Sequence, residues 1–177
     1  LFFCSGIKDN KSSYFRVKIM IPQSDAQWKK FGKTEPYWAV LTSDEYLSEN
    51  MTPENKESFF ESGAHHVDKL KLNLESRFNV DFSPNKTLDF GCGVGRIAVN
   101  LATVSSSLLC MDISPEMLQE SEKNCKERGF SNVSFALSSD RFEGIEESFD
   151  FIHCYLVLQH INPRRGYFII SRLLNML

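Results

Sequence analysis

Residues 87–96 read TLDFGCGVGR, an apolar run that leads into three alternating glycines. The run predicts a strand, and the following residues 96–104, RIAVNLATV, predict a helix. A glycine turn between a parallel strand and its helix can point backbone N–H groups at a ligand beyond the strand. A turn without any ligand would give the same local pattern, so the rest of the chain has to decide between them.

The second half of the chain continues the alternation of strand and helix. Strands are predicted at residues 107–113, 133–139 and 149–158, and helices at residues 114–129 and 162–177. Ser114 followed by Pro115, and Asn162 followed by Pro163, are helix-start signals. Strands separated by helices favour an α/β fold built on a parallel sheet.

Residues 1–82 have a different pattern and are expected to form an extended and helical N-terminal extension with lid-like helices. An edge strand or arm is predicted near residues 15–21, and a short helix from Ser24 to Gly32. Thr52 and Pro53 begin a helix that Gly63 is expected to end, and residues 64–78 form another. The domain that carries the glycine loop is expected to cover residues 83–177.

The composition argues against several classes of partner. The net charge of −3 over 177 residues provides no basic excess, so no nucleic-acid partner is expected. No apolar run reaches the roughly 18 residues that a membrane helix needs, so no membrane partner is expected either. The five cysteines form no C-x-x-C pair, which favours a reducing, cytoplasmic location and no metal site.

The spacing of the loop bears on its ligand. The glycines follow Gly-x-Gly-x-Gly, whereas the dinucleotide fingerprint places its third glycine one residue later, where Arg96 stands. Asp89 would repel a pyrophosphate but attract a cation. A nicotinamide-dependent oxidoreductase is therefore disfavoured. A non-catalytic binding or regulatory module remains an alternative to an enzyme.

Three motifs in this order resemble a known family. LDFGCGVGR, MDISPEML and FDFIHCYLVLQHI are similar to the first, second and fourth strand motifs of class I S-adenosylmethionine-dependent methyltransferases, in their small-molecule branch. The resemblance implies a Rossmann-like parallel sheet, S-adenosyl-L-methionine as cofactor and a small-molecule substrate.

The resemblance also assigns cofactor contacts. Asp112 would bind the ribose hydroxyls, and Ile113 would lie against the adenine. Residues after the third strand would lie beside the adenine, with Asp140 at its amino group. The methionine part would be held by the loop residues Asp89, Gly91, Cys92, Gly93 and Gly95, and the adenine neighbours would be Ser139, Asp140 and Arg141.

The acceptor side is less well defined by the motifs. The resemblance places residues 155–160 on the methyl-transfer side, with Tyr155 and His160 as candidate catalytic residues. His160 could act as a base, since an imidazole titrates near neutral pH. Tyr37 and Trp38 could add aromatic walls, with core packing as the alternative. His65 and His66 are expected to be surface or packing residues.

The family's sheet has seven strands, whereas this chain stops inside the helix that follows the fourth. The C-terminal strands are therefore expected to be missing from it. The family order would be 3-2-1-4, which leaves the apolar run at residues 149–158 at an edge. Such an edge can pair with another chain, so the oligomeric state stays open.

Overall fold

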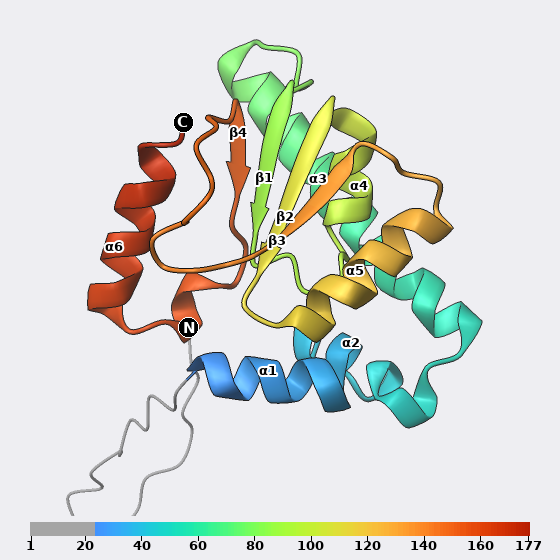
Figure 1. The fold of residues 1–177 in the computed structure, drawn as a ribbon. Coiled ribbons are helices and arrows are strands. Elements are labelled where there is room, and N and C mark those ends of the chain that lie inside the picture. Colours follow the sequence, from blue (N-terminus) through green and yellow to red (C-terminus); the bar gives the residue numbers. More distant parts are fainter. Residues whose placement is uncertain (1–23) are drawn as a thin grey trace, which may run out of the picture.

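The computed structural model describes residues 24–177, which form a four-stranded parallel sheet between layers of helices (Figure 1). The strand order β3-β2-β1-β4 confirms the predicted order and fold class. The expected strand near residues 15–21 lies outside the described residues. The strands are β1 (Lys86–Phe90), β2 (Ser107–Asp112), β3 (Val133–Leu137) and β4 (Phe151–His153).

Six α-helices surround the sheet. They are α1 (Ser24–Thr34), α2 (Pro36–Val40), α3 (Pro53–Phe78), α4 (Ala98–Val104), α5 (Pro115–Glu127) and α6 (Pro163–Leu174), with short 3₁₀ turns at Asp44–Tyr46, Ser48–Asn50 and Leu158–His160. Apolar residues of α3, α4 and α5 pack on one face of the sheet, and those of α6 pack on the other. The helices α1 and α2 lie across the carboxyl ends of the strands (Figure 1).

The helix starts follow the predicted capping residues. The Ser114 hydroxyl accepts a hydrogen bond from the N–H of Met117 at 3.3 Å, and the Asn162 side chain accepts one from the N–H of Arg164 at 3.0 Å. These caps fix where α5 and α6 begin, because they satisfy N–H groups that have no partner inside the helix. The start of α5 is thereby held beside the end of β2, where the site lies.

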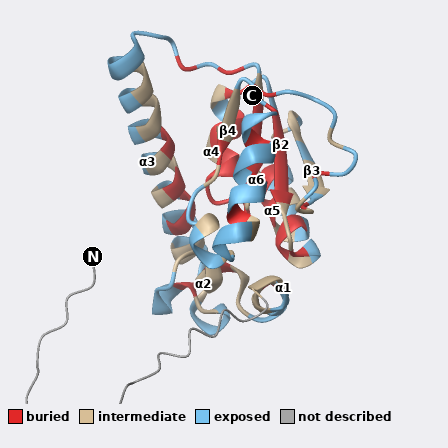
Figure 2. Ribbon diagram, turned by 90° about the vertical axis from the view of Figure 1, so that its left-hand side faces the viewer, coloured by how far each residue is buried: buried red, intermediate tan, exposed pale blue. Residues whose placement is uncertain are grey.

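The prediction that Gly63 ends a helix is wrong. Residues 53–78 form one continuous helix, α3, and Gly63 is buried in its interior. A Cβ atom at Gly63 would overlap the backbone carbonyl oxygen of Arg96. The glycine therefore allows α3 to lie close to the chain just before α4. Figure 2 shows that α3 is buried along one half only, which agrees with its buried residues falling between Phe59 and Val67.

Several other boundaries differ from the prediction by a few residues, and two of these differences affect the walls of the site. The fourth strand ends at His153 instead of reaching residue 158, because Leu156 adopts a left-handed conformation with φ of 59° that no strand accommodates. The chain then turns along the sheet's carboxyl edge. Helix α1 continues past Gly32 to Thr34, with Gly32 buried against the Ser114 side chain.

Candidate functional site

A cavity of about 850 Å³ opens at the carboxyl ends of the strands. Its walls come from α1, α2, the glycine loop after β1, the end of β2 and the segments after β3 and β4. The volume lies in the upper part of the roughly 300–1,000 Å³ range of small-molecule sites.

The glycine loop lies on the floor of the cavity and is tied to β2. The N–H groups of Gly91 and Cys92 both donate to the carbonyl of Met111, at 2.7 and 3.0 Å. Gly91, Gly93 and Gly95 have φ values of 79°, 55° and 87°, a region that glycine adopts without strain. A Cβ atom at Gly93 would lie 2.8 Å from the Val40 side chain, so α2 approaches the loop closely.

Asp112 stands at the end of β2 and joins the loop to α5. Its Oδ2 accepts from the N–H of Gly93 and its Oδ1 from the N–H of Ser114, both at 2.9 Å. Burial raises the pKa of the Asp112 carboxyl, and the two N–H groups counteract this by stabilising the charge. Each oxygen keeps a second lone pair for a ligand, so the carboxylate can accept from two neighbouring hydroxyl groups.

Asp89 contributes an unused acceptor. Its Oδ1 lies 2.7 Å from Nδ1 of His153 on the neighbouring strand β4. Its Oδ2 is buried and has no hydrogen-bond partner among residues 24–177. A buried carboxylate oxygen without a partner is costly, and Asp89 lines the cavity. A cationic donor such as an ammonium group would satisfy it.

Arg96 contributes the opposite charge at the other end of the loop. Its side chain is 6% exposed and lines the cavity, and it forms no ion pair within residues 24–177. Its Nη1 donates to the Ser62 hydroxyl at 3.2 Å, while its Nε has no acceptor in the described part of the chain. Burial lowers the pKa of the Arg96 guanidinium, while Tyr155, Asp89 and Tyr46 act in the opposite direction. A carboxylate would supply the missing partner.

Asp140 lies on the cavity wall but is already paired. The Nε of Arg165 donates to both of its carboxylate oxygens, at 2.8 and 2.7 Å. Arg165 also donates to Asp25 of α1 at 2.6 Å, so it links α1 to the segment after β3. The two carboxylates raise the pKa of Arg165. An adenine amino group would have to share Asp140 with this arginine.

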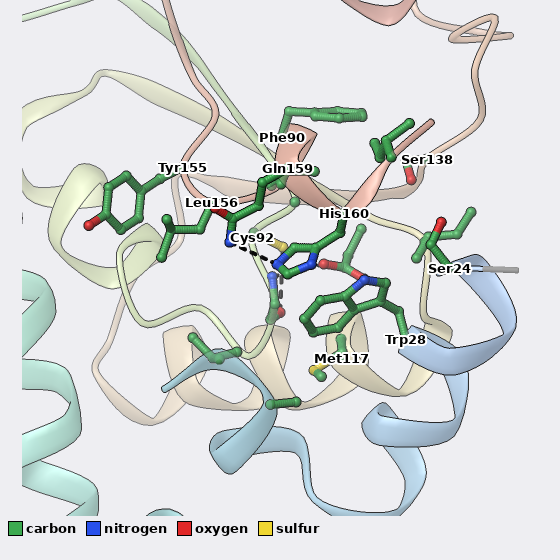
Figure 3. A pocket seen from close by; sticks show the side chains of 18 of the residues that line it. Ser24, Trp28, Phe90, Cys92, Met117, Ser138, Tyr155, Leu156, Gln159 and His160 are labelled. Carbon is green, nitrogen blue, oxygen red and sulfur yellow. Dashed lines mark hydrogen bonds between the residues drawn. The ribbon is translucent and has the colours of Figure 1, made fainter. Parts of the chain in front are cut away.

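Aromatic side chains of the N-terminal helices face the cavity. Figure 3 shows Trp28 and His160 side by side, and their ring centroids are 5.0 Å apart. Trp38 also lines the cavity. Tyr37 does not, because its ring is buried and its hydroxyl donates to Glu120 at 2.7 Å. Of the two aromatic walls predicted, only Trp38 lies at the site.

The structure brings most of the predicted site residues to this one cavity. Gly95 and Arg141 are not among the lining residues: Gly95 packs against Ser121 of α5, and the Arg141 carbonyl accepts from Arg172. The predicted residues that line the cavity are Asp89, Gly91, Cys92, Gly93, Asp112, Ile113, Ser139, Asp140, Tyr155 and His160.

Many lining residues were not predicted, among them Trp28, Phe31, Arg96, His153 and Arg165. His153 carried a signal, since it is a polar residue between apolar neighbours in the predicted fourth strand. The others come together through tertiary contacts between distant segments.

Among residues 24–177, no cluster of three or more metal-binding side chains occurs, and no helix there is long and apolar enough to cross a membrane.

Comparisons with known proteins agree with this geometry. The sequence model of a family described as "Methyltransferase domain" matches residues 87–177, just over half of the chain. A ubiquinone biosynthesis O-methyltransferase of Methylococcus capsulatus is 26% identical over 98 residues, which are 55% of this chain and 41% of that protein. An uncharacterized RNA methyltransferase of Streptococcus pneumoniae is 26% identical over 103 residues, or 58% of this chain and 23% of that protein.

A solved structure has the same fold. The magnesium protoporphyrin IX methyltransferase of Synechocystis PCC 6803, crystallised with S-adenosylhomocysteine, aligns with a TM-score of 0.61 at 22% identity. The alignment covers 85% of this chain and 66% of that one. The chain spans less than half the length of the curated relatives described above.

Proposed function

The chain belongs to the methyltransferase-domain family, and from this premise we propose that it is an S-adenosylmethionine-dependent methyltransferase that acts on a small molecule. One observation carries the proposal. Three charged side chains, Asp89, Arg96 and Asp112, converge on one cavity, and the first two each keep a buried atom that has no hydrogen-bond partner among residues 24–177. Their charges and positions along the glycine loop complement the polar groups of the cofactor.

The cofactor has three polar parts, and each has a counterpart. The ribose diol would donate to Asp112 at the end of β2. The ammonium of the methionine part would donate to Oδ2 of Asp89, and its carboxylate would accept from Nε of Arg96. Ile113 lies beside Asp112 on the cavity wall and would pack against the adenine. Asp140 would reach the adenine amino group while it remains paired with Arg165.

S-adenosylmethionine supplies a methyl group that is already activated by its sulfonium charge. The protein therefore has to align the acceptor and exclude water more than it has to supply reactive groups. Trp28, Trp38 and Tyr155 provide apolar walls for an acceptor. Their rings can shield the transfer from solvent on the side of the N-terminal helices.

A small-molecule acceptor is favoured over a nucleic acid, although some relatives are named as RNA methyltransferases. The net charge of −3 is unsuited to a phosphate backbone, which is bound through many lysines and arginines. The relatives named for ubiquinone biosynthesis and for magnesium protoporphyrin methylation act, by their names, on small molecules. A reducing, cytoplasmic location and a β4 edge open to pairing remain part of this proposal.

The experiment is methyl transfer from S-adenosylmethionine carrying a labelled methyl group. The protein is incubated with cell extract that has been separated into small-molecule, nucleic-acid and protein fractions. Label is expected in the small-molecule fraction, and an Asp112→Ala variant serves as the control. Label that enters only nucleic acid or protein would contradict the small-molecule acceptor. Absence of transfer together with intact S-adenosylhomocysteine binding would favour a non-catalytic binding module.

A further inference from the structure

Three side chains from three different elements form a continuous hydrogen-bonded row. Asp89 of β1 accepts from Nδ1 of His153 of β4 at 2.7 Å, and Nε2 of His153 lies 3.1 Å from Nε2 of His66 on α3. His153 is 7% exposed and lines the cavity, whereas His66 is half-buried and lies outside it. The row therefore leads from the cavity wall toward the outer surface of α3.

The row fixes which nitrogens carry protons. Because the Asp89 carboxylate can only accept, it holds the proton of His153 on Nδ1 and leaves a lone pair on Nε2. His66 then donates its own Nε2 proton to that lone pair. A carboxylate that orients an imidazole, with the far nitrogen free to take a proton, is the arrangement of a general base.

We propose that His153 is the general base of the methyl transfer. In the free protein His66 donates to Nε2 of His153, and the hydroxyl group of the acceptor replaces His66 at this nitrogen when the acceptor binds. This rests on the proposed function and deepens it, because it names the acceptor class as a hydroxyl compound, such as a phenol. A base is useful only where the acceptor must lose a proton. A carboxylate or thiolate acceptor, already ionised, would not need this row.

The step balances as follows. The O–H bond of the acceptor breaks, and its proton joins the lone pair on His153 Nε2. The electron pair of that bond stays on oxygen and forms the new bond to the methyl carbon, while the carbon–sulfur pair remains on sulfur. His153 keeps the proton until the methylated product leaves and then releases it to solvent through the cavity that it lines, and the Nε2–H group of His66 returns to the free lone pair.

The surroundings of His66 suit this role. The ring of Tyr155 lies against it at a centroid distance of 4.3 Å, and the charged groups facing it are His153, Asp89, Arg96 and Lys69. Burial, His153 and Arg96 lower the pKa of His66, which favours the neutral ring that donates its Nε2 proton to His153. Asp89 is the one acidic group that acts in the opposite direction.

His160, the candidate base from the sequence, is less well placed. Its Nε2 is bonded to the Gln159 side chain at 3.0 Å and its ring packs against Trp28 (Figure 3). No hydrogen bond or ion pair joins it to a carboxylate in the described part of the chain. The ring is therefore not oriented as that of His153 is. We assign His160 to the cavity wall.

The first test uses 4-nitrocatechol, a hydroxyl compound whose ionisation is visible by absorbance, with the protein saturated with S-adenosylhomocysteine. This test and the next are run at a pH low enough that the free 4-nitrocatechol is protonated. The bound probe is expected to ionise at least ten times more readily than the free probe, and this gain should be lost in His153→Gln. The His66→Gln variant should change the pH dependence of the ionisation. His65→Gln, an exposed neighbour on the same helix, is the matched control and should behave as the wild type.

The second test compares methyl transfer to 4-nitrocatechol with transfer to 4-nitrothiophenolate, which needs no base. His153→Gln should lower the first rate about 100-fold, as loss of a general base does, and leave the second within threefold. Equal losses for both acceptors, or unchanged probe ionisation in His153→Gln, would overturn the inference. Wild-type protein that binds S-adenosylhomocysteine but not 4-nitrocatechol would overturn the hydroxyl acceptor. Failure to bind S-adenosylhomocysteine would instead overturn the proposed function.

Discussion

Asp89 and His153 are direct partners in the register of β1 and β4, and a hydrogen bond of 2.7 Å joins Oδ1 of the first to Nδ1 of the second. The bond uses only one carboxylate oxygen and holds the side chain in place. The other oxygen, Oδ2, is left buried at the cavity without a partner in the described residues. The same pair thus orients an imidazole and presents a charged acceptor to a ligand.

The first prediction concerns that acceptor. Asp89→Asn keeps the shape of the side chain but removes its charge, so an ammonium group loses a charge-assisted hydrogen bond worth about 1.5–3 kcal/mol. Affinity for S-adenosylhomocysteine should fall at least about tenfold in calorimetric titration. Methylthioadenosine lacks the amino-acid part, and its affinity should stay within about threefold. A similar loss of affinity for both ligands would mean that Asp89 does not bind the ammonium group.

Arg96 gives the complementary prediction. Arg96→Met retains much of the apolar stem but cannot donate to a carboxylate, so S-adenosylhomocysteine should bind about tenfold or more weakly. The affinity of this variant for methylthioadenosine should again be close to that of the wild-type protein. Arg96→Met should not weaken folding strongly, because burial of an unpaired guanidinium is itself costly. An unchanged affinity for S-adenosylhomocysteine would show that Arg96 does not bind the carboxylate of the cofactor.

The raised pKa of Asp112 predicts a pH dependence of binding. The ionised carboxylate is the form that accepts from two ribose hydroxyls. Affinity for S-adenosylhomocysteine should therefore fall as the pH is lowered through a pKa that lies above the usual aspartate value. Asp112→Asn should bind at least about tenfold more weakly at pH 7 and lose this pH dependence. If the variant kept the wild-type pH profile, another group would be responsible.

Two glycines in helices predict opposite effects on stability. Gly63→Ala would drive a Cβ atom into the Arg96 carbonyl oxygen and should lower the free energy of unfolding by about 3 kcal/mol. Gly166→Ala in α6 meets no atom within 4 Å and should raise the free energy of unfolding by about 0.5–1 kcal/mol. Denaturant titrations of both variants provide the comparison. Equal effects would show that α3 does not approach Arg96 this closely.

The sequence predicted the features that depend on neighbouring residues. The caps at Ser114 and Asn162 follow from local patterns, whereas the strand order was implied by the family resemblance. The misplaced helix end at Gly63 reflects a contact with Arg96, which is far away in the chain. The fourth strand was predicted too long because apolar residues continue beyond His153, although the backbone turns at Leu156.

The same distinction between local patterns and tertiary contacts applies to the residues of the candidate site. The glycine loop and Asp112 belong to the first and second predicted motifs and were identified from them. The contact between His66 and His153 joins residues 87 positions apart, and no local pattern indicates it. Arg96 and Asp89 stood in the motif, but only the folded structure shows that each keeps a buried atom without a partner in the described part of the chain. Tertiary packing thus decides which of the conspicuous residues face a ligand.

The central claim is that the cavity binds the products and substrates of S-adenosylmethionine chemistry. Its most direct measurement is calorimetric titration of the wild-type protein with S-adenosylhomocysteine, with NADH titrated in parallel. One molecule of S-adenosylhomocysteine should bind per chain, with affinity reduced in Asp89→Asn, Arg96→Met and Asp112→Asn, and NADH should not bind. Binding of NADH with equal or higher affinity, or no binding of S-adenosylhomocysteine, would contradict the account.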